Sequence, residues 1–181
     1  MFNVLDLQAA FNFKSSSSVC FRLGKLSKKG GTVIIHARSE DQTRAAILSP
    51  LTMIASDGFI ENGRGHPRTS GTYSKVLGKY VRDEHALSLM DAVRKMTLAP
   101  AQRLEARVPA MSTKGRIRVG ADADLTIFDP ATVIDKSTYE DATLPSSGIP
   151  YVIVGGEVVV DSGHVTKARP GRAIRAPHAS P

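Results

Sequence analysis

Residues 32–58 read TVIIHARSEDQTRAAILSPLTMIASDG, and this stretch decides the expected fold. It begins with a β-branched run, TVIIHA, of the kind that forms a buried strand. Ser39 followed by Gln42 has the spacing of a capping box and predicts a helix that ends before Pro50. A second apolar run, residues 51–55, predicts another buried strand. Strand, helix and strand in this order form a βαβ unit, which implies a parallel sheet.

The second apolar run stops at Asp57-Gly58, although ionised groups are expensive to bury. In parallel α/β folds, catalytic groups gather where the carboxyl ends of strands leave the sheet. Asp57 is therefore a candidate metal ligand or general base, with Gly58 allowing the sharp turn after it. The same residues also fit a plain strand-to-loop turn in which Asp57 bonds its own backbone. The spacing leaves both interpretations open.

The loop after Asp57 closes on His66-Pro67-Arg68. Arg68 could clamp a substrate carboxylate through its bidentate fork, and His66 could ligate, donate or orient the loop. The alternative is a surface loop that Pro67 stiffens. The sequence has no H-x-H, H-E-x-x-H or C-x-x-C motif, so it offers no recognisable set of zinc ligands.

The rest of the chain changes from helical to alternating patterning. Helices are expected over residues 72–82, after Ser88 as an N-cap with Asp91 three residues on, and from Pro100. Alternation predicts a half-buried strand at residues 116–119 and another at residues 123–128. Gly155-Gly156 between two β-branched runs, residues 151–154 and 157–160, predicts a tight hairpin.

The composition excludes several classes. One cysteine in 181 residues permits no internal disulfide, which favours a reducing, cytoplasmic setting. No apolar run approaches the ~18–20 residues that cross a bilayer, and the N-terminus lacks a signal-peptide layout. The net charge of +7 lies in the ends: residues 1–30 and 165–181 each carry +4, so residues 31–164 carry −1. This distribution argues against a nucleic-acid surface.

Six separated motifs resemble the C-terminal part of N-acyl-D-amino-acid deacylases (D-aminoacylases), which belong to the amidohydrolase superfamily. The motifs occur in order, and the resemblance runs from about residue 31 to residue 172. They read SDG, HPR, GTYSKVLGKYVRD, then L…DAVRKMT..PA, then G.I..G.DADLTIFDP, and finally GI.YV.V.G..V.

The resemblance implies an α/β fold made of part of a TIM barrel, its last two βα units, and a small C-terminal β-sandwich module. The implied division is a poorly defined segment at 1–30, barrel residues at 31–112, a small β domain at 113–172 and an irregular tail at 173–181.

The resemblance also implies roles for the three candidate residues. Asp57 matches the acid after the eighth barrel strand, the general base that takes a proton from water and returns it to the departing amine. Arg68 matches the arginine that binds the α-carboxylate of an N-acyl-D-amino acid, and His66 matches a residue that shapes the loop. In the full-length family a Zn²⁺ ion polarises the amide carbonyl and lowers the pKa of water.

The departures from the family are informative. A complete (β/α)₈ barrel needs about 200–250 residues by itself, and the family's metal ligands lie upstream of the matched part. Asp57 alone could serve here as a weak ligand. We therefore expect the isolated chain to be a fragment that is marginally stable, binds no zinc tightly and lacks deacylase activity.

Two other interpretations stay open from the sequence. One is another amidohydrolase, such as a dihydroorotase or imidase relative, because dihydroorotate also carries a carboxylate. The other is a non-catalytic remnant that pairs with a complementing chain. A small-molecule substrate is expected if the chain is part of a D-aminoacylase or of another amidohydrolase. Neither nucleic acid nor membrane is expected as a partner.

Overall fold

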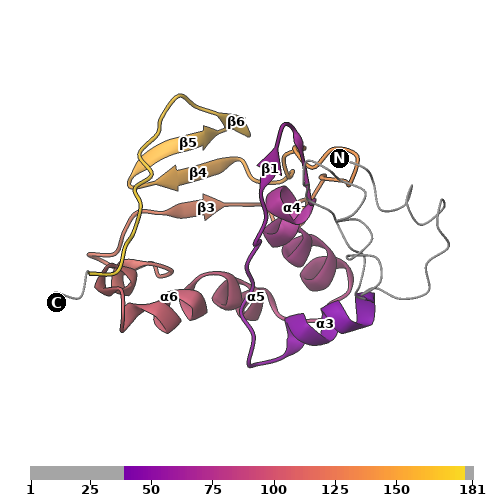
Figure 1. The fold of residues 1–181 in the computed structure, drawn as a ribbon, viewed down its shortest axis with the longest axis horizontal. Helices are drawn as coiled ribbons and strands as arrows, with labels where there is room; N and C mark the ends of the chain where they lie inside the picture. The colour runs from indigo at the N-terminus through magenta and orange to yellow at the C-terminus, as the bar shows by residue number, and fades with distance from the viewer. Residues whose placement is uncertain (1–38, 178–181) are drawn as a thin grey trace, which may run out of the picture. The chain divides into compact units, whose positions relative to one another are not determined.

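A computed structural model describes residues 39–177 of the chain. The chain divides into two units, residues 1–43 and 44–181, and the described part of the first is only the start of one helix. Figure 1 shows the described elements. They are α3 (Glu40–Leu48), β1 (Ile60–Glu61), β2 (Arg64–Gly65), α4 (Arg68–Lys75), the π-helix η1 (Val76–Asp83), α5 (Leu89–Met96), α6 (Leu98–Glu105), the 3₁₀ helix η2 (Pro109–Thr113), β3 (Leu125–Ile127), β4 (Tyr151–Val154), β5 (Glu157–Asp161) and β6 (His164–Val165).

Two of the predicted helix starts, at Ser39 and Ser88, are confirmed by capping bonds. The Ser39 N–H donates to Gln42 Oε1 at 3.1 Å, and the Gln42 N–H donates to Ser39 Oγ at 3.3 Å, which is a reciprocal capping box. Ser88 is the N-cap of α5: its Oγ accepts from the Asp91 N–H at 3.1 Å. The helix predicted from Pro100 is α6, which begins two residues earlier at Leu98. None of the helices between residues 39 and 177 has the length and apolar character to span a bilayer.

The burial predicted for a strand at residues 51–55 is wrong within the described part of the chain. This segment is extended but joins no described sheet, and only Ile54 is buried, while the side chain of Leu51 is 93% exposed. The Ile54 N–H donates to the carbonyl of Lys95 at 3.1 Å instead of to a neighbouring strand. An apolar run becomes a buried strand only where both of its faces are covered. The partner strand predicted at residues 32–37 lies outside the described residues, so the parallel pairing stays a prediction.

The helix predicted over residues 72–82 begins earlier, at Arg68, and continues from α4 into the π-helix η1. Val76, Leu77 and Tyr80 are buried, whereas Tyr73 is 44% exposed. The change to π geometry shifts the residues after Lys75 out of the 3.6-residue period. The core cluster comprises Ile54, Val76, Leu77, Tyr80, Ala92 and Val133.

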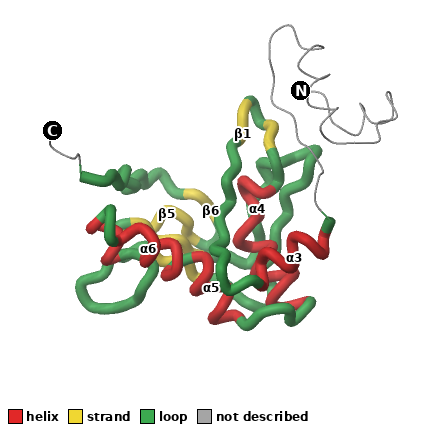
Figure 2. Tube along the Cα trace, turned by 60° about the horizontal axis from the view of Figure 1, so that its bottom comes forward, coloured by secondary structure: helices red, strands yellow, loops and turns green. Residues whose placement is uncertain are grey.

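The C-terminal half forms one antiparallel sheet in the order β3-β4-β5-β6 (Figure 1). Figure 2 shows β5 and β6 of this sheet in yellow. The predicted hairpin is confirmed, with positive φ at both turn residues, 57° at Gly155 and 84° at Gly156. Strand β6 was not predicted. The half-buried strand predicted at residues 116–119 is wrong, because Ile117 and Val119 are fully solvent-exposed. Both sheets within residues 39–177 are antiparallel, so the barrel strands and a second sandwich layer stay predictions.

Lys114 ties the segment before β3 to the sheet. Its ammonium bonds Asp124 Oδ2 and lies 3.0 Å from Asp122 Oδ2. The Lys114 bond, followed by the N–H of Gly155, holds the pKa of Asp124 below its usual value. Lys114 and then the Thr113 hydroxyl also lower the pKa of Asp122. Both carboxylates therefore favour the folded state while they are ionised.

We expect acid to weaken the fold through this cluster. Because the folded-state pKa of each carboxyl is depressed, its contribution is present above the unfolded value and is lost as the pH falls below about 4. Melting temperatures measured by circular dichroism should fall over this range in the parent chain. The fall should be shallower in Lys114→Met and unchanged in Lys167→Met, since Lys167 is an exposed lysine. Identical pH profiles for the parent and Lys114→Met would contradict the assignment.

Candidate active site

Asp57 ends the extended segment and turns the chain. Its backbone is in the left-handed region, with φ at 42°, which few residues other than glycine adopt. Its side chain is 96% exposed, and the nearest charge is the Arg68 guanidinium, with Nη2 4.0 Å from Asp57 Oδ2. The carboxylate is thus open to solvent beside one cation.

Arg68 begins α4 and reaches back to the turn. Its Nε donates to the backbone carbonyl of Asp57 at 3.0 Å, and its own N–H donates to His66 Nδ1 at 3.0 Å. The guanidinium is half exposed, so its Nη groups lie at the surface next to the carboxylate. The structure therefore brings together all three residues predicted from the sequence.

The segment between β3 and β4 holds the other side of this loop. The rings of His66 and Tyr139 meet edge to face, with centroids 5.2 Å apart. Ser137 Oγ donates to the carbonyl of Pro67 at 2.8 Å, and Ser70 Oγ donates to the carbonyl of Ala142 at 2.7 Å. No pattern in the sequence signals this contact, because it joins residues about seventy positions apart.

The loop between Gly58 and His66 is a small hairpin that sequence reasoning missed. Strands β1 and β2 pair antiparallel around Asn62 and Gly63, whose φ values are 51° and 73°. Asn-Gly is the commonest pair in a two-residue hairpin turn, so the signal was present in the letters ENGR. Gly63 thus serves the turn of this hairpin.

Gly58 is needed for a different reason from the one expected. The sharp turn occurs at Asp57 itself, where φ is positive. A Cβ placed on Gly58 would lie 2.2 Å from Thr69 Oγ1 and 2.9 Å from Thr69 Cα. The glycine therefore permits the close approach of the loop to the first turn of α4.

The described residues do not fit a zinc ion by themselves. No group of three His, Cys, Asp or Glu side chains that could hold a metal occurs within residues 39–177. Asp57 is a single carboxylate facing an arginine, and His66 Nδ1 already accepts the N–H of Arg68. A zinc site of the usual kind needs three or four such ligands.

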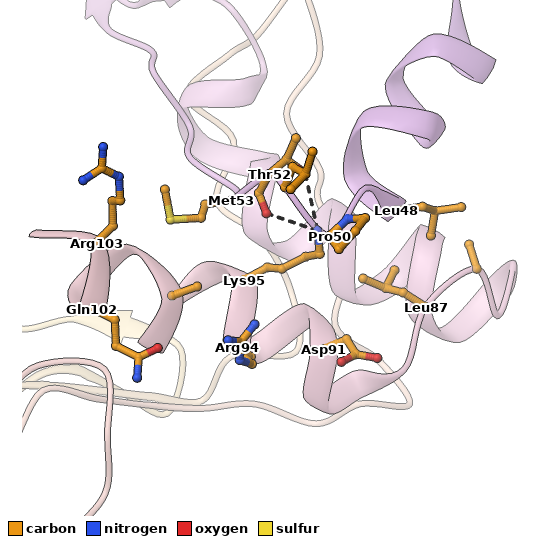
Figure 3. A pocket seen from close by; sticks show the side chains of 13 residues that line it. Leu48, Pro50, Thr52, Met53, Leu87, Asp91, Arg94, Lys95, Gln102 and Arg103 are labelled. Carbon is orange, nitrogen blue, oxygen red and sulfur yellow. Dashed lines mark hydrogen bonds between the residues drawn. The ribbon is translucent and has the colours of Figure 1, made fainter.

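A cavity of about 740 Å³ lies away from this loop, and its lining contains none of Asp57, His66 and Arg68 (Figure 3). Lys95 reaches into it from α5, and its Nζ donates to the carbonyls of Ser49 and Thr52. These bonds satisfy the buried ammonium and attach residues 49–52 to α5. The cavity is therefore not the candidate site.

The chain matches known proteins over most of its length. The model of the Amidohydrolase family matches residues 16–160. An N-acyl-D-glutamate deacylase of Alcaligenes xylosoxydans xylosoxydans is 39% identical over 142 residues, which are 78% of this chain and 28% of the relative. A D-aminoacylase of the same organism is 36% identical over 170 residues, 94% of this chain and 33% of the relative.

Solved structures give the same result. A crystal structure of D-aminoacylase superposes with a TM-score of 0.69 at 37% identity, covering 75% of this chain and 28% of that one. An N-acyl-D-glutamate deacylase from Bordetella bronchiseptica, complexed with zinc and a phosphonate inhibitor, gives a TM-score of 0.66 at 36% identity and covers 76% of this chain and 28% of that one.

These matches refine the sequence predictions. The chain spans about a third or less of the length of the curated relatives that it matches. The family match begins at residue 16, fifteen residues before residue 31, where the resemblance recognised in the sequence begins. Deacylase relatives fit the D-aminoacylase interpretation better than the dihydroorotase or imidase alternative.

Proposed function

Because the chain belongs to the amidohydrolase family, we propose that it forms the C-terminal part of a cytoplasmic hydrolase that cleaves the amide bond of N-acyl-D-amino acids. The observation that carries the proposal is the pairing of an exposed Asp57 carboxylate with the Arg68 guanidinium at the same turn. In this proposal residues 31–112 contribute the last two βα units of a TIM barrel. Residues 113–172 contribute the small β domain.

The two charged groups have complementary tasks. Asp57 takes a proton from the attacking water and later returns it to the departing amine, which requires an accessible, ionised carboxylate. Arg68 binds the free α-carboxylate of the substrate through its Nη groups while its Nε stays on the Asp57 carbonyl. His66 shapes the loop by accepting the Arg68 N–H. Zinc, as in the related Bordetella structure, would supply Lewis-acid chemistry, and its ligands would come from outside the described residues.

We expect Arg68 to control substrate affinity. A suitable assay uses a chimera in which this chain replaces the aligned segment of the curated D-aminoacylase, with N-acetyl-D-amino acids as substrates. Arg68→Ala should raise KM about tenfold or more, because it removes a charge-assisted hydrogen bond. Arg103→Ala is the matched control, since Arg103 lines the separate cavity. With an α-carboxamide substrate, the difference in KM between the parent and Arg68→Ala should disappear. A chimera that hydrolyses no N-acyl-D-amino acid would refute the proposed function.

We expect the isolated chain to hold much less than one zinc ion. The described residues offer no ligand cluster, and residues 1–38 contain one cysteine and one histidine, Cys20 and His36. Inductively coupled plasma analysis of the purified chain, dialysed against zinc and then against buffer, measures this directly. One tightly held zinc per chain would contradict the expectation. A complementing chain would supply the missing zinc ligands. Size-exclusion chromatography of this chain mixed with that complementing chain would detect the complex between them.

A further inference from the structure

The turn at Asp57 adopts a strained conformation that something must hold. A left-handed backbone at a residue other than glycine costs roughly 1 kcal/mol or more and persists only when its surroundings fix it. Asp57 has no covering side chains, because its carboxylate is almost fully exposed. The restraint must therefore act through the backbone on either side of it.

Two bonds from the first turn of α4 supply this restraint. Arg68 Nε donates to the carbonyl of Asp57 at 3.0 Å, and Thr69 Oγ1 donates to the carbonyl of Phe59 at 3.3 Å. Thr69 also packs against Gly58 so closely that a Cβ on Gly58 would overlap it. Residues 57–59 are thus held at both ends and in the middle by two successive residues of one helix.

We propose that Thr69 is a positioning residue for Asp57: its hydroxyl and its contact with Gly58 hold the turn that presents the carboxylate. Thr69 has no role in binding or proton transfer in the proposed function. It is half-buried behind the turn, and its own N–H bonds the carbonyl of His66 at 3.0 Å, which anchors it in the helix. The part of the inference that concerns catalysis rests on the proposed function, whereas the part that concerns the turn does not.

The test is nuclear magnetic resonance on the full 181-residue chain. A residue with positive φ gives a strong intraresidue HN–Hα Overhauser peak, because the two protons are close. Ser162, with φ at 50° in the distant β5–β6 turn, gives the same signature and is the internal control. Thr69→Val should lose the strong peak at Asp57 and keep it at Ser162, and Thr69→Ser should keep both.

Gly58→Ala provides a second perturbation of the same contact from its other side. It should also lose the Asp57 signature, since the new methyl group forces Thr69 and the turn apart. An intact Asp57 signature in both Thr69→Val and Gly58→Ala would overturn the inference. In the active chimera, Thr69→Val should lower kcat with KM unchanged, and Thr69→Ser should restore it. If the chimera is inactive, the spectra of the 181-residue parent and its variants still decide whether Thr69 holds the Asp57 turn.

Discussion

Asp57→Asn is expected to lower kcat for N-acyl-D-amino acid hydrolysis by about 10²–10⁴-fold in the active chimera, the range in which general bases contribute. Asparagine keeps the shape of the side chain and tolerates the left-handed backbone found here, with φ at 42°, but it cannot accept a proton. The loss of activity should therefore appear in kcat while KM changes little, because Arg68 still binds the α-carboxylate of the substrate. Steady-state kinetics with N-acetyl-D-amino acids measures both constants.

Asp41→Asn is the matched control for this substitution. Asp41 is an exposed carboxylate in the first turn of α3, away from the Asp57 turn in the sequence, so its loss should leave kcat unchanged. Activity that survives Asp57→Asn within a factor of a few would contradict the role of general base. An equal fall in both variants would indicate damage to the fold.

The grouping of the three candidate residues was predictable because its signals are local. Asp57, His66 and Arg68 lie within twelve residues of one another. The segment that joins them contains glycine, asparagine and proline, which are typical turn residues. The grouping of Asp57, His66 and Arg68 in space follows from the return of the chain through β1 and β2. The capping box at Ser39 and the N-cap at Ser88 were predictable for the same reason, since each involves a residue three positions away.

What escaped prediction depends on contacts between distant segments. Tyr139 meets His66, and Ser137 meets Pro67, across about seventy residues of sequence, with no pattern that links them. The extended segment around Ile54 was expected to be buried on both faces, yet covering it requires neighbours that its own sequence does not specify. The reason for Gly58 was likewise hidden, because it lies in the approach of Thr69 and not in the φ of the glycine.

Tyr80→Ala is expected to be the most destabilising single change among the side chains considered. Tyr80 is 1% exposed and is one of the two largest fully buried side chains of the described residues. It belongs to the core cluster that joins η1 and α5 to Val133 in the segment after β3. Truncating a large buried aromatic residue costs about 3–5 kcal/mol through lost transfer free energy and the cavity left behind.

Tyr73→Ala is the matched control for Tyr80→Ala, since both tyrosines lie on the continuous helix from Arg68 to Asp83 and Tyr73 is 44% exposed. Surface substitutions usually change stability by within about 0.5 kcal/mol, so its melting temperature should stay close to that of the parent. For a chain of this size the core loss corresponds to a fall of about 10 °C, measurable by circular dichroism melts. Equal falls in the two variants would show that the π-helical segment after Lys75 does not direct Tyr80 into the core. The core would then have to be sought on the face of the helix that carries Tyr73.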